Sequence, residues 1–224
     1  MLPVADSLAT PPPRPAAAAV RLRARVRRFL AAEAPAWSAP DRAASWDGFD
    51  ADFSRRMGAA GFIGLTLPKA YGGHGRSALE RYVVCEEALV AGAPVGSHWF
   101  ADRQSGPLIA RFGSEAQKRA ILPALCRGEL CFCIGMSEPA AGSDLAALRT
   151  EARRVPGGFV VDGRKLWTTN AHRAHYMIAL VRTTPRAEAA GRHAGFSQFL
   201  VDLARPGIEI RPVRALHGRE HFNE

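Results

Sequence analysis

The sequence has 224 residues, of which 47% are hydrophobic and 23% are charged. A chain of this size and composition can bury the core of one large or two small domains, so general disorder is excluded as the main state. Charges interrupt every apolar run before it reaches the about 20 residues of a membrane span. The net charge of +9 comes from arginines spread along the chain, which predicts no nucleic-acid-binding stripe and stays compatible with a phosphate-bearing coenzyme.

The first fifteen residues are rich in proline and lack apolar periodicity, so residues 1–15 are predicted to form a disordered arm. The opening segment is short and contains Asp6, which is not the pattern of a secretory signal. Four cysteines are too few for a disulfide scaffold and indicate a reducing, cytoplasmic location. They show no zinc-ligand spacing, so no metal site is predicted. They are Cys85, Cys126, Cys131 and Cys133.

Helical periodicity extends over residues 16–129, which are predicted to form an N-terminal α-helical domain. Residues 16–33 read as an amphipathic helix that packs on later helices, with a membrane surface as the alternative partner. Further helices are expected over residues 49–60, 78–90 and 98–111, with a tight glycine turn at 71–75. A fifth helix should begin at Ser114, whose hydroxyl can form a capping box with Gln117, and Pro123 should kink or shorten it.

After residue 129 the period changes to short apolar runs bounded by turn residues, so residues 130–224 are predicted to form a β-domain that is incomplete. The fold class is therefore α+β, an all-α domain followed by an antiparallel β-domain. The expected strands cover residues 130–136, 159–161, 165–169, 176–181, 196–203 and 208–213. Cys131 and Cys133 fit one face of the first of these strands.

The most informative stretch is residues 135–147, a strand that runs into a loop of small residues. Gly142 is free to adopt a positive φ, and hydroxyl and carboxylate groups surround it. Backbone amides with Ser137 and Ser143 could cradle a pyrophosphate or the polar edge of a ring, although an ordinary polar β-turn has the same composition.

Residue by residue, this stretch resembles the first signature of the acyl-CoA dehydrogenase family, and residues 163–170 resemble the second. The turn at 71–73, the helix join at 111–115 and the closing residues 222–224 also match. The resemblance implies an N-terminal helical domain, a middle β-barrel-like domain and a C-terminal four-helix domain, with FAD between them. The chain would then be truncated before the C-terminal domain, which carries the catalytic base, so no catalytic residue is predicted here.

The resemblance also implies which residues contact FAD. Ser137 would lie near the polar edge of the flavin ring, and Ser143 near the pyrophosphate or the CoA arm of the substrate. Trp167 would cover one flavin face, with a core tryptophan as the alternative, and Thr169 would meet the hydride-accepting N5, with a plain strand threonine as the alternative. The full cofactor set is Ile134, Gly135, Met136, Ser137, Gly142, Ser143, Trp167, Thr168 and Thr169.

The second motif departs from the family pattern at one point, and the first contains a glutamate that could be mistaken for a base. Many relatives follow the threonine with Asn-Gly, whereas this chain has Asn170, Ala171 and His172, so the local turn is expected to differ. Glu138 has the chemistry of a general base, but the matching glutamate in the family belongs to the loop's structure. No proton transfer is assigned to it.

The implied reaction is FAD-dependent α,β-dehydrogenation of an acyl-CoA thioester to a trans-2-enoyl-CoA, with electrons passed to an electron-transfer flavoprotein. The full-length form is expected to be a homo-oligomer, and the isolated chain is expected to be inactive. Residues 98–100 would lie near the acyl pocket. Two alternatives stay open, namely a flavin oxidase or monooxygenase of the same fold, and a catalytically dead subunit that binds flavin or acyl-CoA.

Overall fold

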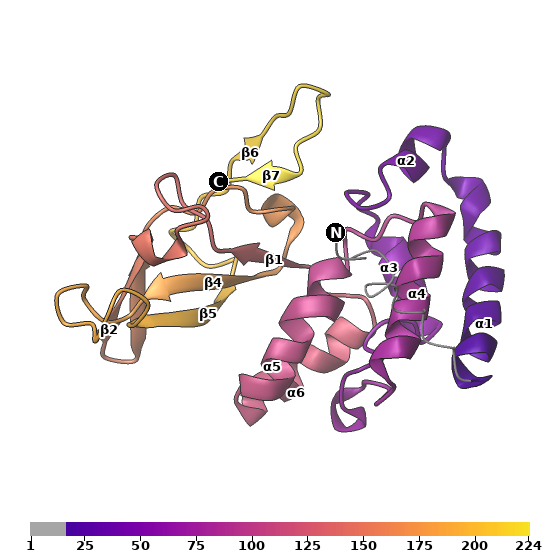
Figure 1. Cartoon of the computed structure of the whole chain (residues 1–224), viewed down its shortest axis with the longest axis horizontal. Coiled ribbons are helices and arrows are strands. Elements are labelled where there is room, and N and C mark those ends of the chain that lie inside the picture. Colours follow the sequence, from indigo (N-terminus) through magenta and orange to yellow (C-terminus); the bar gives the residue numbers. More distant parts are fainter. Residues whose placement is uncertain (1–16) are drawn as a thin grey trace, which may run out of the picture.

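The computed structural model describes residues 17–224, and the expected arm at residues 1–15 lies outside them. The chain folds into a helical part followed by a β-sheet part, which lie side by side (Figure 1). Helices give way to strands between residues 126 and 132. The predicted order of an α-domain and a β-domain is confirmed.

Every helix predicted within the described chain is present. Ser114 and Gln117 form the expected capping box, with hydrogen bonds of 2.8 and 3.2 Å between the side chain of each and the backbone N–H of the other. The helix continues three residues past Pro123 and ends at Cys126. The bounds are α1 Ala17–Glu33, α2 Ala39–Ala43, α3 Ala51–Ala59, α4 Ala78–Ala91, α5 Gly106–Phe112 and α6 Glu115–Cys126. Shorter 3-10 turns cover Ala34–Ala36, Lys69–Tyr71, Leu145–Ala147 and Ala171–Arg173.

Two helical features differ from expectation. The helix α2 is a single turn, too short to show an apolar periodicity in the sequence. It begins with a capping box between Ser38 and Asp41. The helix expected over 98–111 contains a π-helical turn at Ala101–Ser105, in which the N–H of Gly106 donates to the carbonyl of Ala101. Pro107 follows at once and has no N–H for an α-helical bond, so the wider turn lets the helix continue across it.

The apolar stripe of α1 is buried against the other helices, which supports the packing interpretation over the membrane one. Leu22, Val26 and Leu30 are each at most 3% exposed. On the adjacent face Arg23 and Arg27 pair with the buried carboxylate of Glu87 on α4. No helix within residues 17–224 is both long and apolar enough to cross a membrane.

The sheet is built around β4, which has neighbours on both sides. The strand β1 pairs with β4 in parallel, β2 touches β4 in parallel through Glu151 and Arg182, and β5 pairs with β4 antiparallel. The sheet is therefore mixed, where an antiparallel one was expected, because the long chain between β1 and β4 returns without a hairpin. The bounds are β1 Phe132–Gly135, β2 Glu151–Val155, β3 Gly158–Asp162, β4 Tyr176–Arg182, β5 Phe196–Asp202, β6 Pro212–Val213 and β7 Phe222–Asn223.

Two strand predictions need correction, and one strand was missed. Residues 165–169 form a loop and not a strand, because their backbone bonds go to two separate segments. Only Pro212–Val213 of the run at 208–213 is a strand, and it pairs with β7. The strand β2 was not predicted, since its sequence is mostly charged and only Ala152 is buried within it.

One hydrophobic core joins the two parts of the chain. Phe132 of β1 and Ile178 of β4 belong to the same buried cluster as the helical side chains Phe53, Met57 and Leu122. Cys131 and Cys133 are also buried, as expected for the first strand. This shared core sets how the loops of the β-domain face the helical domain.

Candidate functional site

The first motif forms a tight loop after β1. The backbones of Glu138 and Ala141 exchange two hydrogen bonds of 2.9 and 3.1 Å, and Gly142 and Ser143, which follow this turn, are exposed. Gly142 does not use the positive φ that a glycine allows, and the chain turns at this bonded pair instead. A Cβ at Gly135 would come within 2.5 Å of the sulfur of Met177, so a larger residue there would have to displace that side chain.

Glu138 is buried and holds this loop in place. Its carboxylate accepts hydrogen bonds from the backbone N–H groups of Arg149 (2.6 Å) and Thr150 (3.0 Å), from the Thr150 hydroxyl (2.5 Å) and from Lys165 Nζ (2.8 Å). Burial alone would raise the pKa of Glu138, but Lys165 and the other donors outweigh it and lower that pKa to about 2. A carboxylate so occupied is a poor proton acceptor at neutral pH.

The structure brings the second motif against the first. The N–H of Leu166 donates to the carbonyl of Ser137 at 2.9 Å, and Lys165 Nζ donates to the carbonyl of Met136 at 3.2 Å. Gly163 lies so close to Thr150 that a Cβ would meet its backbone Cα at 2.6 Å. The two motifs, about thirty residues apart in the sequence, therefore form one surface.

Trp167 is 55% exposed, so it is not a core tryptophan. Its backbone has a φ of 61°, which is rare for a bulky residue. The indole meets the ring of Phe222 edge to face, with centroids 5.7 Å apart. A broad aromatic face is thus presented to the outside by a backbone in an unfavourable conformation.

The threonines beside it have different surroundings. Thr168 is 3% exposed and its hydroxyl has no hydrogen-bond partner. Thr169 is half-buried, and within residues 17–224 its backbone N–H makes no hydrogen bond. Of the first motif, Gly135 is buried, while Ile134, Met136 and Ser137 are half-buried. A buried unpaired hydroxyl and a free amide are groups that a polar ligand can satisfy.

The strand β7 lies behind this segment, and sequence reasoning did not foresee its role. Thr168 and Asn223 are joined by a backbone hydrogen bond of 3.0 Å, and the N–H of Asn170 donates to the carbonyl of His221 at 2.6 Å. No local pattern indicates such pairing, because the partners lie more than fifty residues apart. The resemblance at residues 222–224 was the only signal for it.

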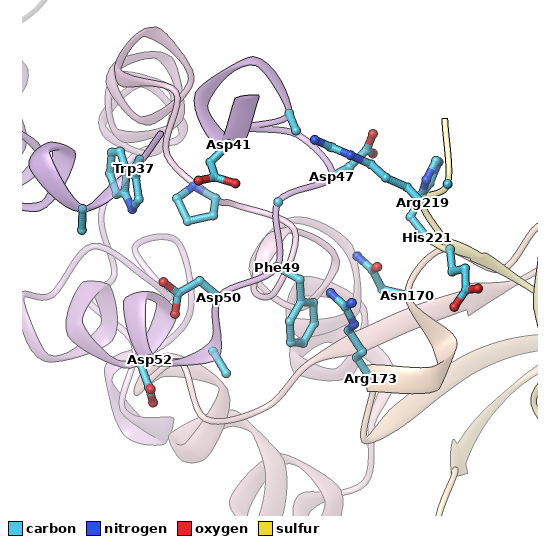
Figure 2. A pocket seen from close by; sticks show the side chains of 17 residues that line it. Trp37, Asp41, Asp47, Phe49, Asp50, Asp52, Asn170, Arg173, Arg219 and His221 are labelled. Carbon is cyan, nitrogen blue, oxygen red and sulfur yellow. The ribbon is translucent and has the colours of Figure 1, made fainter. Parts of the chain in front are cut away.

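A cavity of about 760 Å³ lies between the helical part and the β-domain. Figure 2 shows Asp41, Asp47 and Asp50 on the helical side, and Arg173, Arg219 and His221 on the other. Hydrogen bonds from Ser38 lower the pKa of Asp41, and the positive charge of Arg219 adds to this effect. The helical wall is therefore acidic, while the other wall combines Arg173 and Arg219 with the single carboxylate of Glu220.

The predicted cofactor residues do not line this cavity, which reaches the second motif only through Asn170. Asn170 is 3% exposed and the nitrogen of its side chain has no partner. Residues 98–100, expected near an acyl pocket, are also absent from its lining, although His98 and Trp99 border a much smaller cavity of about 20 Å³. No group of three or more potential metal ligands gathers anywhere in residues 17–224.

Comparisons with known proteins agree with the two-part fold and the paired motifs. Residues 17–129 match the model of the acyl-CoA dehydrogenase N-terminal domain, and residues 133–223 match that of the middle domain. The chain belongs to the acyl-CoA dehydrogenase family.

Three relatives illustrate the match. The acyl-CoA dehydrogenase FadE26 of Mycobacterium tuberculosis is 41% identical over 163 residues, which cover 73% of this chain and 40% of that protein. The solved Tcur3481-Tcur3483 steroid ACAD is 34% identical with a TM-score of 0.82, over 94% of this chain and 54% of the other. The ChsE4-ChsE5 complex from Mycobacterium tuberculosis is 34% identical with a TM-score of 0.81 and the same coverage. The chain thus spans about half the length of these relatives.

Proposed function

We propose that this chain is the N-terminal and middle part of an FAD-dependent acyl-CoA dehydrogenase, which converts an acyl-CoA thioester to a trans-2-enoyl-CoA. The observation that carries the proposal is Trp167, an exposed indole on a strained backbone, next to Leu166, whose N–H donates to the carbonyl of Ser137 in the first motif. A tryptophan of the core would not be exposed in this way. A planar ligand that stacks on the indole would cover this exposed face.

The residues present fit FAD. Trp167 would stack on one face of the flavin, while the hydroxyl and free amide of Thr169 would bind its polar edge at N5. The amides from Ile134 to Ser137 would line the ring, and those near Gly142 and Ser143 would bind its pyrophosphate or the CoA arm. When bound, FAD supplies the acceptor for the hydride from Cβ, and the protein supplies orientation and electrostatics.

The catalytic base is proposed to lie outside this chain. Within the motifs the carboxylate that could be considered as a base is Glu138. Its four hydrogen-bond donors and its pKa of about 2 oppose the uptake of a proton from the substrate. The base would come from a C-terminal domain, since the chain spans 40% of FadE26. Passage of electrons to an electron-transfer flavoprotein, homo-oligomerisation and a cytoplasmic location are part of the same proposal.

A second candidate function, a catalytically dead subunit, is favoured by one finding. The ChsE4-ChsE5 relative is a complex of two different chains, so a chain of this family can assemble with a different partner. Native mass spectrometry of the purified complex would distinguish one long polypeptide from a short chain bound to a complete one.

The test of the main proposal is to purify the full polypeptide and add a saturated acyl-CoA with a dye acceptor. We expect a yellow protein that bleaches the dye and forms enoyl-CoA, whereas residues 1–224 alone, supplied with FAD, should form none. A colourless full polypeptide that FAD cannot reconstitute would overturn the proposal. Oxygen uptake with peroxide release would indicate an oxidase, and turnover by residues 1–224 would place the base within this chain.

A further inference from the structure

The backbone around the second motif is held in an unfavourable conformation. Within residues 17–224, Trp167 and Asn170 are the only residues other than glycine with a positive φ, at 61° and 54°. They stand on either side of Thr168 and Thr169, so the strained stretch coincides with the proposed flavin contacts. Such backbone conformations persist only where surrounding structure enforces them.

The side chain of Asn223 supplies much of this enforcement. It is 0% exposed, and its Nδ2 donates to the carbonyl of Thr168 at 2.9 Å. Its Oδ1 lies 2.7 Å from Nδ1 of His172. Because Nδ2 is used by Thr168, Oδ1 is the acceptor in the second contact, and His172 must carry a proton on Nδ1 to donate it.

The side-chain amide of Asn223 therefore forms hydrogen bonds with both ends of the short stretch from Thr168 to His172. Neutral imidazole with its proton on Nδ1 and the imidazolium cation both donate from that atom, so this contact survives in either charge state. The backbone N–H groups of Thr168 and Asn170 also donate to this part of the chain, to the carbonyls of Asn223 and His221. The preceding residue of β7, Phe222, meets the indole of Trp167.

We propose that Asn223 is a positioning residue that holds the segment from Trp167 to Asn170 in the conformation that presents the indole and the Thr169 amide to flavin. It acts through Thr168 and His172 and does not touch the cofactor, since it is fully buried. This inference rests on the proposed function. It assigns the β6–β7 hairpin the role of a support for the cofactor face.

The experiment compares variants of the full polypeptide. Asn223→Ala removes the contacts to Thr168 and His172 together with a longer bond of 3.3 Å to the carbonyl of His221. Asn223→Asp keeps the acceptor for His172 but loses the donor to Thr168, and His172→Ala removes the contact to His172 alone. Val181→Ala, a fully buried residue near the end of β4, is the control for general loss of stability. The two readouts are hydrogen exchange of the peptide over residues 166–171 without flavin, and the dissociation constant for FAD.

We expect Asn223→Ala to speed exchange of this peptide and to weaken FAD binding, each by about tenfold, the factor for one or two lost buried hydrogen bonds. Asn223→Asp and His172→Ala should give smaller changes in the same direction. Val181→Ala should lower the melting temperature without either change.

Two results would overturn the inference, namely unchanged exchange in a folded Asn223→Ala protein, or faster exchange with wild-type affinity for FAD. If the wild-type protein binds no FAD, the proposed function fails and its link to Asn223 fails with it. In that case the exchange measurement alone still decides whether Asn223 holds the segment.

Discussion

The ends of the helices and the loops of the β-domain satisfy their backbone groups in opposite ways. In α4 and α6 the first turn is capped by a serine and by the residue three positions later, Ser77 with Glu80 and Ser114 with Gln117. In the second motif the backbone partners are distant: the N–H of Leu166 donates to the carbonyl of Ser137, and the carbonyl of Thr168 accepts from Nδ2 of Asn223. Helix ends that are capped by neighbouring residues should tolerate substitutions elsewhere in the chain. The candidate site, whose hydrogen bonds join distant residues, depends on several segments at once.

The largest effect should come from Gly163, where the second motif packs against Thr150, a residue that donates two hydrogen bonds to Glu138 of the first motif. Gly163→Ala would place a Cβ 2.6 Å from the Cα of Thr150, where neither backbone can move freely. We expect unfolding to become easier by about 3 kcal/mol, measured by urea denaturation. Gly191→Ala is the matched control, because nothing lies within 4 Å of its position. Equal stability of the two variants would show that Gly163 is not tightly packed against Thr150.

The second effect is a dependence of stability on pH through Glu138. Its pKa is lowered in the folded state from 4.5 to about 2. The stabilisation is therefore present above pH 4.5 and is lost as the pH falls toward 2. After a discount for solvent screening it amounts to about 2 kcal/mol.

Urea denaturation between pH 2 and pH 6 would measure it, and Glu138→Gln should remove this part of the pH dependence. The exposed Glu209→Gln variant is the control. An unchanged pH profile in Glu138→Gln would contradict the structural role of this carboxylate.

The third effect tests the helical part, whose helix starts are capped by nearby residues. Ser114→Ala removes the hydroxyl that accepts from the N–H of Gln117, and we expect a loss of about 1 kcal/mol. Ser77→Ala should cost a similar amount, since its helix begins with the same box. Neither change should alter FAD binding. Loss of flavin in either variant would mean that the helix ends are coupled to the site.

The smallest effect on folding should come from Trp167→Ala, because the indole is largely exposed, and we expect a change below about 0.5 kcal/mol. Flavin should nevertheless bind more weakly by roughly 2- to 12-fold, since a stacked aromatic contributes about 0.5–1.5 kcal/mol. Flavin retention and the rate of flavin reduction would be measured in the full polypeptide. Trp46→Ala, also exposed but on the helical part, is the control. Unchanged retention and rate would reject the stacking role.

The difference between the halves also explains what sequence reasoning could predict. The five expected helices are found in the structure because apolar spacing and capping residues act within one or two turns of the chain. The π-helical turn at Ala101–Ser105 was missed because it depends on how the chain accommodates Pro107. The loop at 165–169 was expected to be a strand because its apolar pattern carries no information on where its backbone bonds go.

The sequence by itself determined the order of an α-domain and a β-domain, the capped start of the helix at Ser114 and the two motifs that resemble an acyl-CoA dehydrogenase. These features depend on residues close together in the chain. Only the tertiary structure decided that β1 and β4 run in parallel, that Trp167 is exposed on a strained backbone, and that Asn223 joins Thr168 to His172. Each of these depends on contacts between residues far apart, whose hydrogen-bonding groups meet only when the common core brings the segments together.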